Sequence, residues 1–266
     1  MGSIHTTEGI RNIQVNIPFS MLYKGYLDRF VKYRLNPEIG FDAQSLDTYS
    51  LADFGDIADR LKKNGLTTTF HAPFMDLAPG SPDPAVRALT RQRFSQVLQL
   101  VSVFRPKTMV CHGGYDNKRY GHMREEWLQN SLEIWEWLAA DIRSAGAVLM
   151  IENVYEQGPA EMRPLLERLQ NQGVRFCLDI GHQHAFSRSS LDDWLQVLGP
   201  YLGQLHLHDN DGKQDSHLSL GKGTNDLSVL FRFLKANSDG PLVMTLEPHK
   251  ESDLWPSLEY LKEAWR

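Results

Sequence analysis

Short apolar runs alternate along this chain with longer segments in which apolar residues recur every three or four positions. The short runs are rich in Val, Ile and Phe and have the length of buried strands, whereas the longer segments have the period of amphipathic helices. The clearest helical segments are residues 83–104 and 123–146, and the second ends at the helix-stopping Gly146. The strand-like runs are residues 12–17, 38–43, 67–72, 108–113, 148–153, 174–180, 202–208 and 241–247.

Alternation between strand and helix predicts parallel strands that are joined by crossover helices. Eight such pairs within 266 residues predict an α/β fold, a (β/α)8 TIM barrel. No Pro- or Ser-rich linker or low-complexity segment divides the chain, so we expect one domain over residues 1–266. Residues 1–9 are expected to be a disordered or tag-derived N-terminus. Trp127, Trp135 and Trp137 are expected to pack the second helix against the barrel.

Composition narrows the class of protein only slightly. Hydrophobic residues make up 41% of the chain and charged residues 23%, as in globular proteins, and no apolar run is long enough to cross a membrane. The start of the chain lacks an export signal, so we expect a cytoplasmic protein without a membrane partner. The net charge of −5 gives no basic surface for nucleic acid, which argues weakly against DNA binding. Cys111 and Cys177 lie in strand-like runs and are expected to be buried, reduced thiols.

Ionisable side chains stand at the carboxyl ends of six consecutive predicted strands. In a barrel these ends meet on one face, where reactive groups lie. Each residue alone has an ordinary explanation, such as capping a carbonyl or a helix terminus. Together they would form a repulsive, poorly solvated cluster unless cations held them, and nitrogen and oxygen ligands without a thiolate suit zinc or manganese. The predicted metal ligands are His71, His112, Glu152, Asp179, His182, His206, Asp215, His217 and Glu247.

Several motifs among these residues resemble one protein family. They are "LDIGH" (178–182), "HLHDNDG" (206–212), "DSHLSLGKG" (215–223), "IENV" (151–154) and "LEPH" (246–249). With them the chain resembles the xylose isomerase-like TIM barrels, which include sugar phosphate isomerases and epimerases and the endonuclease IV-like AP endonucleases. The resemblance extends over nearly the whole chain.

The resemblance implies roles for the predicted ligands. It implies that Glu152, Asp179, His206 and Glu247 hold one divalent ion, as in the isomerases and epimerases. The other five residues stand where the endonuclease branch has the remaining ligands of a three-zinc cluster. The cofactor that the resemblance implies is therefore one to three divalent ions per chain, zinc or manganese.

Two chemistries fit such a site, and the ligands alone do not choose between them. The leading prediction is a metal-dependent sugar or sugar-phosphate isomerase or epimerase, in which Glu152 and Glu247 move protons through an enediolate. The alternative is a zinc-dependent AP endonuclease or phosphodiesterase, in which closely spaced ions activate water. A third class is a barrel that binds a metal or ligand without catalysis. The expected partner is a small sugar or sugar phosphate, with nucleic acid only under the alternative and a homo-oligomer left open.

Loops outside the ligand set favour the sugar assignment. "LDIGHQHAF", "DSH" and "HAPFMDLAPGSPD" look closer to sugar isomerase-like members of the family than to its endonuclease branch. Phe74, which Met75 follows, is predicted to cover a small-molecule pocket and contact substrate, with DNA intercalation as the alternative.

Further residues near the predicted ligands are candidates for substrate contacts. Lys222, between two glycines, is predicted to bind a substrate phosphate, or else to lie in a solvated turn. His182 is predicted to contact substrate as well as metal. His184, His208 and His249 each follow a predicted ligand by two residues, and they are expected to hydrogen-bond ligands or substrate, or to have ordinary surface or packing roles.

Overall fold

The computed structural model describes residues 13–237 and 242–264, so the predicted N-terminus at residues 1–9 lies outside the described residues. Its eight strands are parallel, and each pairs with the next until β8 pairs with β1 and closes a barrel. The predicted (β/α)8 TIM barrel is therefore confirmed, while the extent of the domain stays a prediction. The strands are β1 (Gln14–Pro18), β2 (Asn36–Gly40), β3 (Thr69–His71), β4 (Thr108–His112), β5 (Val148–Glu152), β6 (Arg175–Asp179), β7 (Leu202–Leu207) and β8 (Val243–Leu246).

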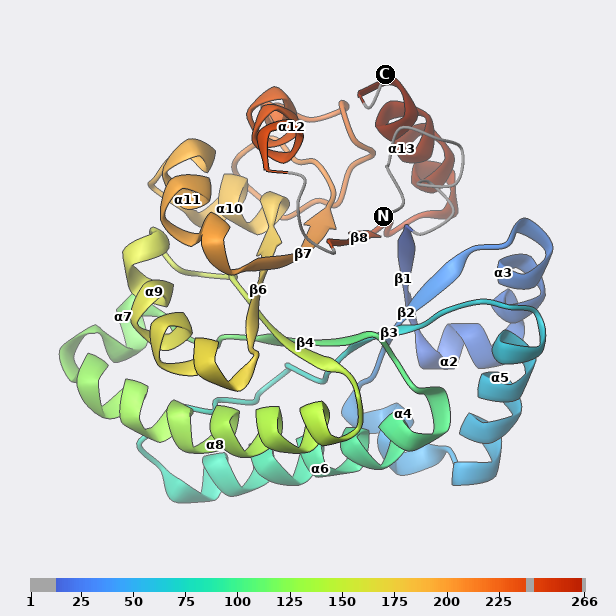
Figure 1. Cartoon of the computed structure of the whole chain (residues 1–266), viewed down its shortest axis with the longest axis horizontal. Coiled ribbons are helices and arrows are strands. Elements are labelled where there is room, and N and C mark those ends of the chain that lie inside the picture. The colour runs from blue at the N-terminus through green and yellow to red at the C-terminus, as the bar shows by residue number, and fades with distance from the viewer. Residues whose placement is uncertain (1–12, 238–241, 265–266) are drawn as a thin grey trace.

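Helices surround the strands on the outside of the barrel (Figure 1). The two helical segments that are clearest in the sequence form α6 (Pro84–Phe104) and α8 (Arg124–Ser144), which pack side by side. α8 ends just before Gly146, whose φ of 84° lies in the left-handed region that terminates helices. The helices are α2 (Phe19–Met21), α3 (Leu27–Tyr33), α4 (Ala43–Thr48), α5 (Leu51–Lys63), α6 (Pro84–Phe104), α7 (Asn117–Tyr120), α8 (Arg124–Ser144), α9 (Pro159–Leu169), α10 (Ile180–Phe186), α11 (Leu191–Leu198), α12 (Leu227–Ala236) and α13 (Glu251–Ala264).

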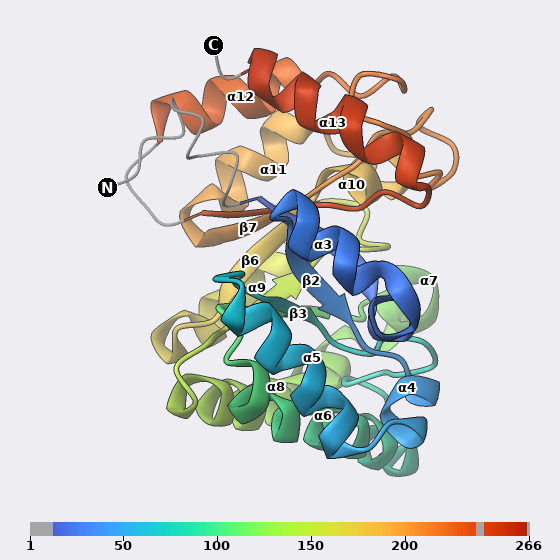
Figure 2. The ribbon, with the colours of Figure 1, turned by 90° about the vertical axis from the view of Figure 1, so that its right-hand side faces the viewer.

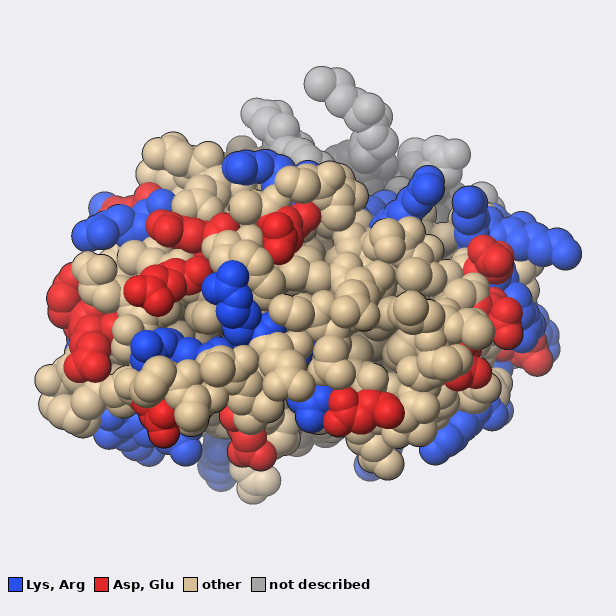
Figure 3. Space-filling model, turned by 90° about the horizontal axis from the view of Figure 1, so that it is seen from below, with Lys and Arg blue, Asp and Glu red and all other residues tan. Residues whose placement is uncertain are grey.

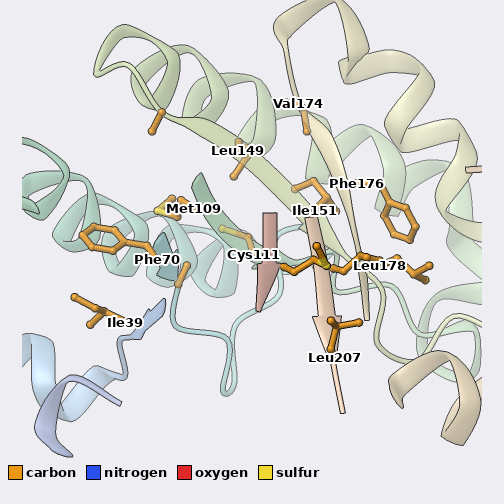
Figure 4. Packing of buried hydrophobic residues seen from close by; sticks show 14 of the residues in the cluster. Ile39, Phe70, Met109, Cys111, Leu149, Ile151, Val174, Phe176, Leu178 and Leu207 are labelled. Atoms are coloured by element: carbon orange, nitrogen blue, oxygen red, sulfur yellow. The ribbon is translucent and has the colours of Figure 1, made fainter. Parts of the chain in front are cut away.

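The apolar core fills the layer between strands and helices. Figure 4 shows part of it, including Phe70, Met109, Leu149 and Phe176 from four different strands. Burial on this face explains why the strands read as apolar runs in the sequence. Because side chains alternate along a strand, the neighbouring residues point into the barrel instead.

The interior of the barrel contains a layer of polar side chains. Gln204 on β7 donates to Glu38 on β2 at 2.6 Å, and Thr108 on β4 donates to Gln204 at 2.7 Å. These three strands are not neighbours in the sheet, so the bonds cross the inside of the barrel. Since His206 on β7 contacts Glu38, the polar layer reaches the end of the barrel where the predicted ligands lie.

The outer surface carries charges of both signs. On the face formed by α6 and α8, acidic and basic side chains are interspersed (Figure 3). This face therefore presents no continuous basic surface of the kind that binds nucleic acid. Among the described residues, no helix is both long and apolar enough to span a bilayer.

The tryptophans of α8 pack against their surroundings to different degrees. Trp135 is fully buried, and its ring centroid lies 5.6 Å from that of Phe94 on α6. Trp127 is also buried. Trp137 is only partly buried, with the guanidinium of Arg91 4.1 Å above its ring. The expected packing role is therefore confirmed, and Trp135 is the most deeply buried of the three.

We expect Trp135→Ala to lower the free energy of unfolding by about 3–5 kcal/mol, because it leaves a large cavity between α6 and α8. Urea denaturation monitored by circular dichroism measures this change. Trp137→Ala is the matched control on the same helix, and we expect it to cost about 1 kcal/mol, mainly through the lost cation–π contact. Equal losses in the two variants would contradict the described packing.

Candidate metal centre

The predicted ligands lie on the side of the barrel where the strands end. Figure 2 shows the arrowhead of β2 directed towards this side, on which α7 also lies. His71, His112, Glu152 and Asp179 are the last residues of β3, β4, β5 and β6, and Glu247 directly follows β8. Since parallel strands place their carboxyl ends on one face, these side chains converge there.

Glu152 is the carboxylate around which the histidines gather. Its Oε2 lies 3.3 Å from His71 Nε2 and 3.5 Å from His112 Nε2. Its Oε1 lies 3.4 Å from His182 Nδ1 and 3.2 Å from His206 Nδ1. The Glu152 side chain is only 1% exposed, so these imidazoles replace water around a carboxylate.

His206 links Glu152 to the other carboxylates. Its Nδ1 lies 3.2 Å from Glu247 Oε1 and 3.8 Å from Asp179 Oδ2. Its Nε2 lies 2.9 Å from Oε1 of Glu38. The structure thus brings together the four residues that the resemblance assigns to one divalent ion.

Asp215 organises a second group of histidines beside the first. Its Oδ2 lies 3.0 Å from His217 Nε2 and 3.3 Å from His182 Nε2. His217 stacks on His208 with ring centroids 3.8 Å apart, and on its other face it stacks on His249 at 3.7 Å. All nine residues predicted as ligands therefore lie in one continuous cluster.

His208 belongs to this cluster more closely than the sequence suggested. Its Nε2 lies 3.1 Å from both carboxylate oxygens of Asp179, and its Nδ1 lies 3.5 Å from Asp215 Oδ1. The signal for this was present in the sequence, because His206 and His208 are two residues apart and such residues share one face of an extended strand. By contrast, His184 lies outside the cluster and contacts Thr224.

Local structure explains the motif that carries Asp179. Asp179 caps α10, and its Oδ1 accepts from the backbone N–H of His182 at 2.7 Å. Asn153 holds the same turn, because it both donates to the carbonyl and accepts from the N–H of Asp179, each at 2.9 Å. Gly181 is required for close packing, since a Cβ there would lie 1.9 Å from the His208 ring. The motif thus positions a carboxylate and two imidazoles together.

Carbonyl and carboxylate acceptors orient the imidazole rings. His71 Nδ1 lies 3.0 Å from the carbonyl of Ala72, and His217 Nδ1 lies 2.9 Å from the carbonyl of Glu247. When these nitrogens donate, the opposite Nε2 atoms present lone pairs to Glu152 and Asp215. This is the arrangement of histidines that bind metals.

The two predicted catalytic glutamates have pKa values shifted in opposite directions. Burial raises the pKa of Glu152, but nearby imidazoles, above all His206, outweigh it and hold the pKa well below its usual range. Burial prevails at Glu247 and raises the pKa of that carboxyl. Without a bound cation, Glu247 therefore retains a proton at higher pH than Glu152 does.

The donor set fits a divalent cation. Within the described part of the chain, Glu152 Oε2, His208 Nδ1 and Asp215 Oδ1 are buried without a hydrogen-bond partner. A buried polar atom without a partner costs free energy, and cations bound within the cluster would give these atoms partners. The groups that could hold an ion are His71, His112 and Glu152; His71, His206 and Glu247; His208, His217 and Glu247; and Glu152, Asp179 and His182.

A cavity of about 1150 Å³ opens above the cluster. Glu152 and Glu247 line its base, and Phe74 and Tyr155 contribute to its walls. Phe74 is half-exposed and stacks on His112, with ring centroids 4.3 Å apart. The predicted pocket position of Phe74 therefore agrees with the structure.

Lys222 lies apart from this cavity. Asp209 Oδ2 accepts from the backbone N–H groups of Gly221 at 3.0 Å and Gly223 at 2.9 Å, and its Oδ1 accepts from that of Asn225 at 3.2 Å. The amides on both sides of Lys222 thus already bind a carboxylate. Because Lys222 is not among the cavity-lining residues, its predicted phosphate contact gains no support.

The sequence of this chain matches the family described as xylose isomerase-like TIM barrel over residues 36–264. The chain belongs to this family. Two uncharacterised proteins of Methanocaldococcus jannaschii are each 27% identical to it. The first match covers 73% of this chain and 68% of the relative. The second covers 76% of this chain and 78% of the relative.

Solved structures extend the comparison. A protein of Thermus thermophilus, solved after soaking with zinc chloride, is 29% identical with a TM-score of 0.81, over 95% of this chain and 97% of that one. A D-tagatose 3-epimerase-like protein is 19% identical, with a TM-score of 0.81, and the match covers 95% of this chain and 96% of that protein. The 3-keto-D-glucoside 4-epimerase of E. coli is 17% identical, with a TM-score of 0.70, and the match covers 95% of this chain and 98% of that protein. The similarity to the last two proteins shows a shared fold.

We expect zinc binding near neutral pH to release protons. Burial lowers the pKa of His217, but the hydrogen bond with Asp215 outweighs burial and raises the pKa to about 9. His217 is therefore protonated near neutral pH and must lose a proton to bind zinc, so affinity should rise with pH until His217 is neutral. Calorimetry in two buffers with different ionisation enthalpies measures the release. A titration above the pKa of His217 is the control, and identical binding enthalpies in both buffers near neutral pH would contradict this prediction.

Proposed function

We propose that the protein is a divalent-metal-dependent isomerase or epimerase of sugars or sugar phosphates. The observation that carries the proposal is the placement of Glu152 and Glu247. Each has a carboxylate oxygen 3.2 Å from His206 Nδ1, and both line the base of the cavity. Two carboxylates beside one metal position, open to a pocket of substrate size, suit the transfer of protons at a carbon next to a carbonyl.

Glu152, Asp179, His206 and Glu247 would hold the ion nearest the substrate, which we propose to be zinc or manganese. The remaining imidazoles and Asp215 offer positions for further ions, up to three in all. A bound divalent ion would supply a Lewis acid for the carbonyl and hydroxyl oxygens of a sugar, which favours an enediolate.

The two glutamates divide the proton transfers in this proposal. Glu152 comes from β5 and Glu247 from the end of β8, two strands that are not neighbours in the barrel, and we propose that the two carboxylates act on opposite sides of the reacting carbon. Their oppositely shifted pKa values suit one proton acceptor and one proton donor. In an epimerisation, removal of a proton on one face and return on the other inverts the carbon.

Walls of the cavity provide the contacts expected for a sugar. The half-exposed ring of Phe74 offers an apolar surface for the C–H face of a pyranose or furanose, and it shields the cluster from water. His182 also lines the cavity and can hydrogen-bond a hydroxyl group.

A second candidate function is an AP endonuclease or phosphodiesterase. It is favoured by one observation: the five further residues predicted as ligands for a multi-ion site, His71, His112, His182, Asp215 and His217, all join the cluster. Closely spaced ions suit phosphodiester hydrolysis.

We expect Glu152→Gln and Glu247→Gln each to slow the exchange of solvent deuterium into a ketose by about 10²–10⁴-fold, because each removes a proton-transfer group. NMR of ketoses incubated with the manganese- or zinc-loaded protein measures this exchange. Glu133→Gln, an exposed change on α8, is the control and should leave the rate unchanged.

Incision of abasic-site DNA by the wild-type protein, without exchange into any ketose, would replace the proposed function with the second candidate. Full exchange activity in Glu152→Gln would contradict the assigned catalytic role of that residue.

A further inference from the structure

Glu38 is a fully buried carboxylate inside the barrel, and it is not among the residues that line the cavity. Its Oε1 lies 2.9 Å from His206 Nε2. The opposite ring nitrogen, Nδ1, faces Glu152 and Glu247 at 3.2 Å from each. One imidazole ring therefore joins Glu38 on one side to the candidate metal centre on the other.

Hydrogen bonds from three other strands fix the orientation of Glu38. Its Oε2 accepts from the hydroxyls of Thr69 on β3 and Thr245 on β8, each at 3.0 Å, and from the amide of Gln204 on β7 at 2.6 Å. Turning the carboxylate away would leave these buried donors unpaired. Oε1 is consequently held towards His206.

Among the described residues, the buried thiol of Cys177 also lies within hydrogen-bonding reach of the His206 ring, but a neutral thiol is a weaker acceptor than a carboxylate. Gln204 Nε2 lies 3.4 Å away, but this amide nitrogen is itself a donor, and it is bonded to Glu38. The Oε1 atom of Gln204 already accepts from Thr108 at 2.7 Å. The carboxylate of Glu38, 2.9 Å away, is therefore the strongest acceptor beside His206 Nε2 among the described residues.

We propose that Glu38 is a positioning residue that accepts the hydrogen on His206 Nε2 and so keeps Nδ1 available as a metal ligand. A neutral imidazole carries one N–H, so fixing it at Nε2 leaves a lone pair on Nδ1, directed at Glu152 and Glu247. A carboxylate acceptor also makes the opposite nitrogen a stronger ligand. The inference rests on the metal centre of the proposed function and extends it to a residue that touches neither cavity nor substrate.

Zinc affinity of the full-length protein, measured by competition with a chromophoric chelator, tests this role. We expect Glu38→Gln to weaken zinc binding by about 10–100-fold, because the neutral amide polarises the ring less and can also present a donor to it. Thr69→Val is the matched control. It removes one hydrogen bond to the same carboxylate but leaves the contact with His206, so its affinity should stay close to that of the wild type.

A spectroscopic measurement separates positioning from a general loss of structure. In the zinc-loaded wild type with ¹⁵N-labelled histidine, we expect His206 to show a slowly exchanging, low-field proton on Nε2. This proton should move upfield or vanish in Glu38→Gln, while the melting temperature of each metal-free variant reports on folding. Glu38→Asp retains the charge but withdraws it from the ring, and it should weaken zinc binding if Glu38→Gln does not fold.

The outcomes distinguish this inference from the proposed function. If Glu38→Gln folds and binds zinc as tightly as the wild type, the positioning role is overturned but the metal centre is not. If Glu38→Gln does not fold, the same result in Glu38→Asp has the same meaning. An unchanged His206 signal in Glu38→Gln would do the same. A wild-type protein that binds no zinc would overturn the metal centre together with the inference.

Discussion

The ionised state of one buried carboxylate, Glu152, is the constraint on which the site depends. Its side chain is 1% exposed, and four imidazoles, three from strands and one from helix α10, replace the water that it lacks. Removing a charged group from water is costly unless compensating charges surround it. Protonated histidines would provide such charges in part. Bound divalent cations would provide them and would also give partners to Glu152 Oε2, His208 Nδ1 and Asp215 Oδ1, which are buried without a hydrogen bond.

The barrel provides the rigidity that such a cluster requires. Its apolar residues lie between strands and helices, so the strand ends are held by a packed core (Figure 4). Its interior is polar, and the network around Glu38 connects four strands beneath His206. His206, which we propose as a metal ligand, would thus be oriented from inside the barrel, while the carboxylates proposed to act on substrate reach it from the rim.

The sequence predicts the residues of this site better than it predicts the buried residues that position them. The pattern of apolar residues predicts where each strand ends. Because the carboxyl ends of parallel strands in a barrel meet on one face, this pattern also predicts that Glu152, Asp179 and Glu247 lie on the same face. Glu38 was not found, because periodicity marks it as buried but does not show that it faces His206 across the barrel. Likewise, the glycines around Lys222 suggest a loop that binds an anion. In the structure, the backbone N–H groups of Gly221 and Gly223 instead donate to the carboxylate of Asp209. Contacts between segments distant in the chain decide both cases.

Anomalous diffraction at the zinc edge, from crystals of the wild-type protein grown with zinc, would locate ions bound in this cluster. We expect a peak within bonding distance of Glu152 and His206 Nδ1, with any further peaks among the histidines around Asp215. Crystals in which this cluster gives no anomalous peak, while zinc binds elsewhere on the protein, would contradict the proposed metal centre.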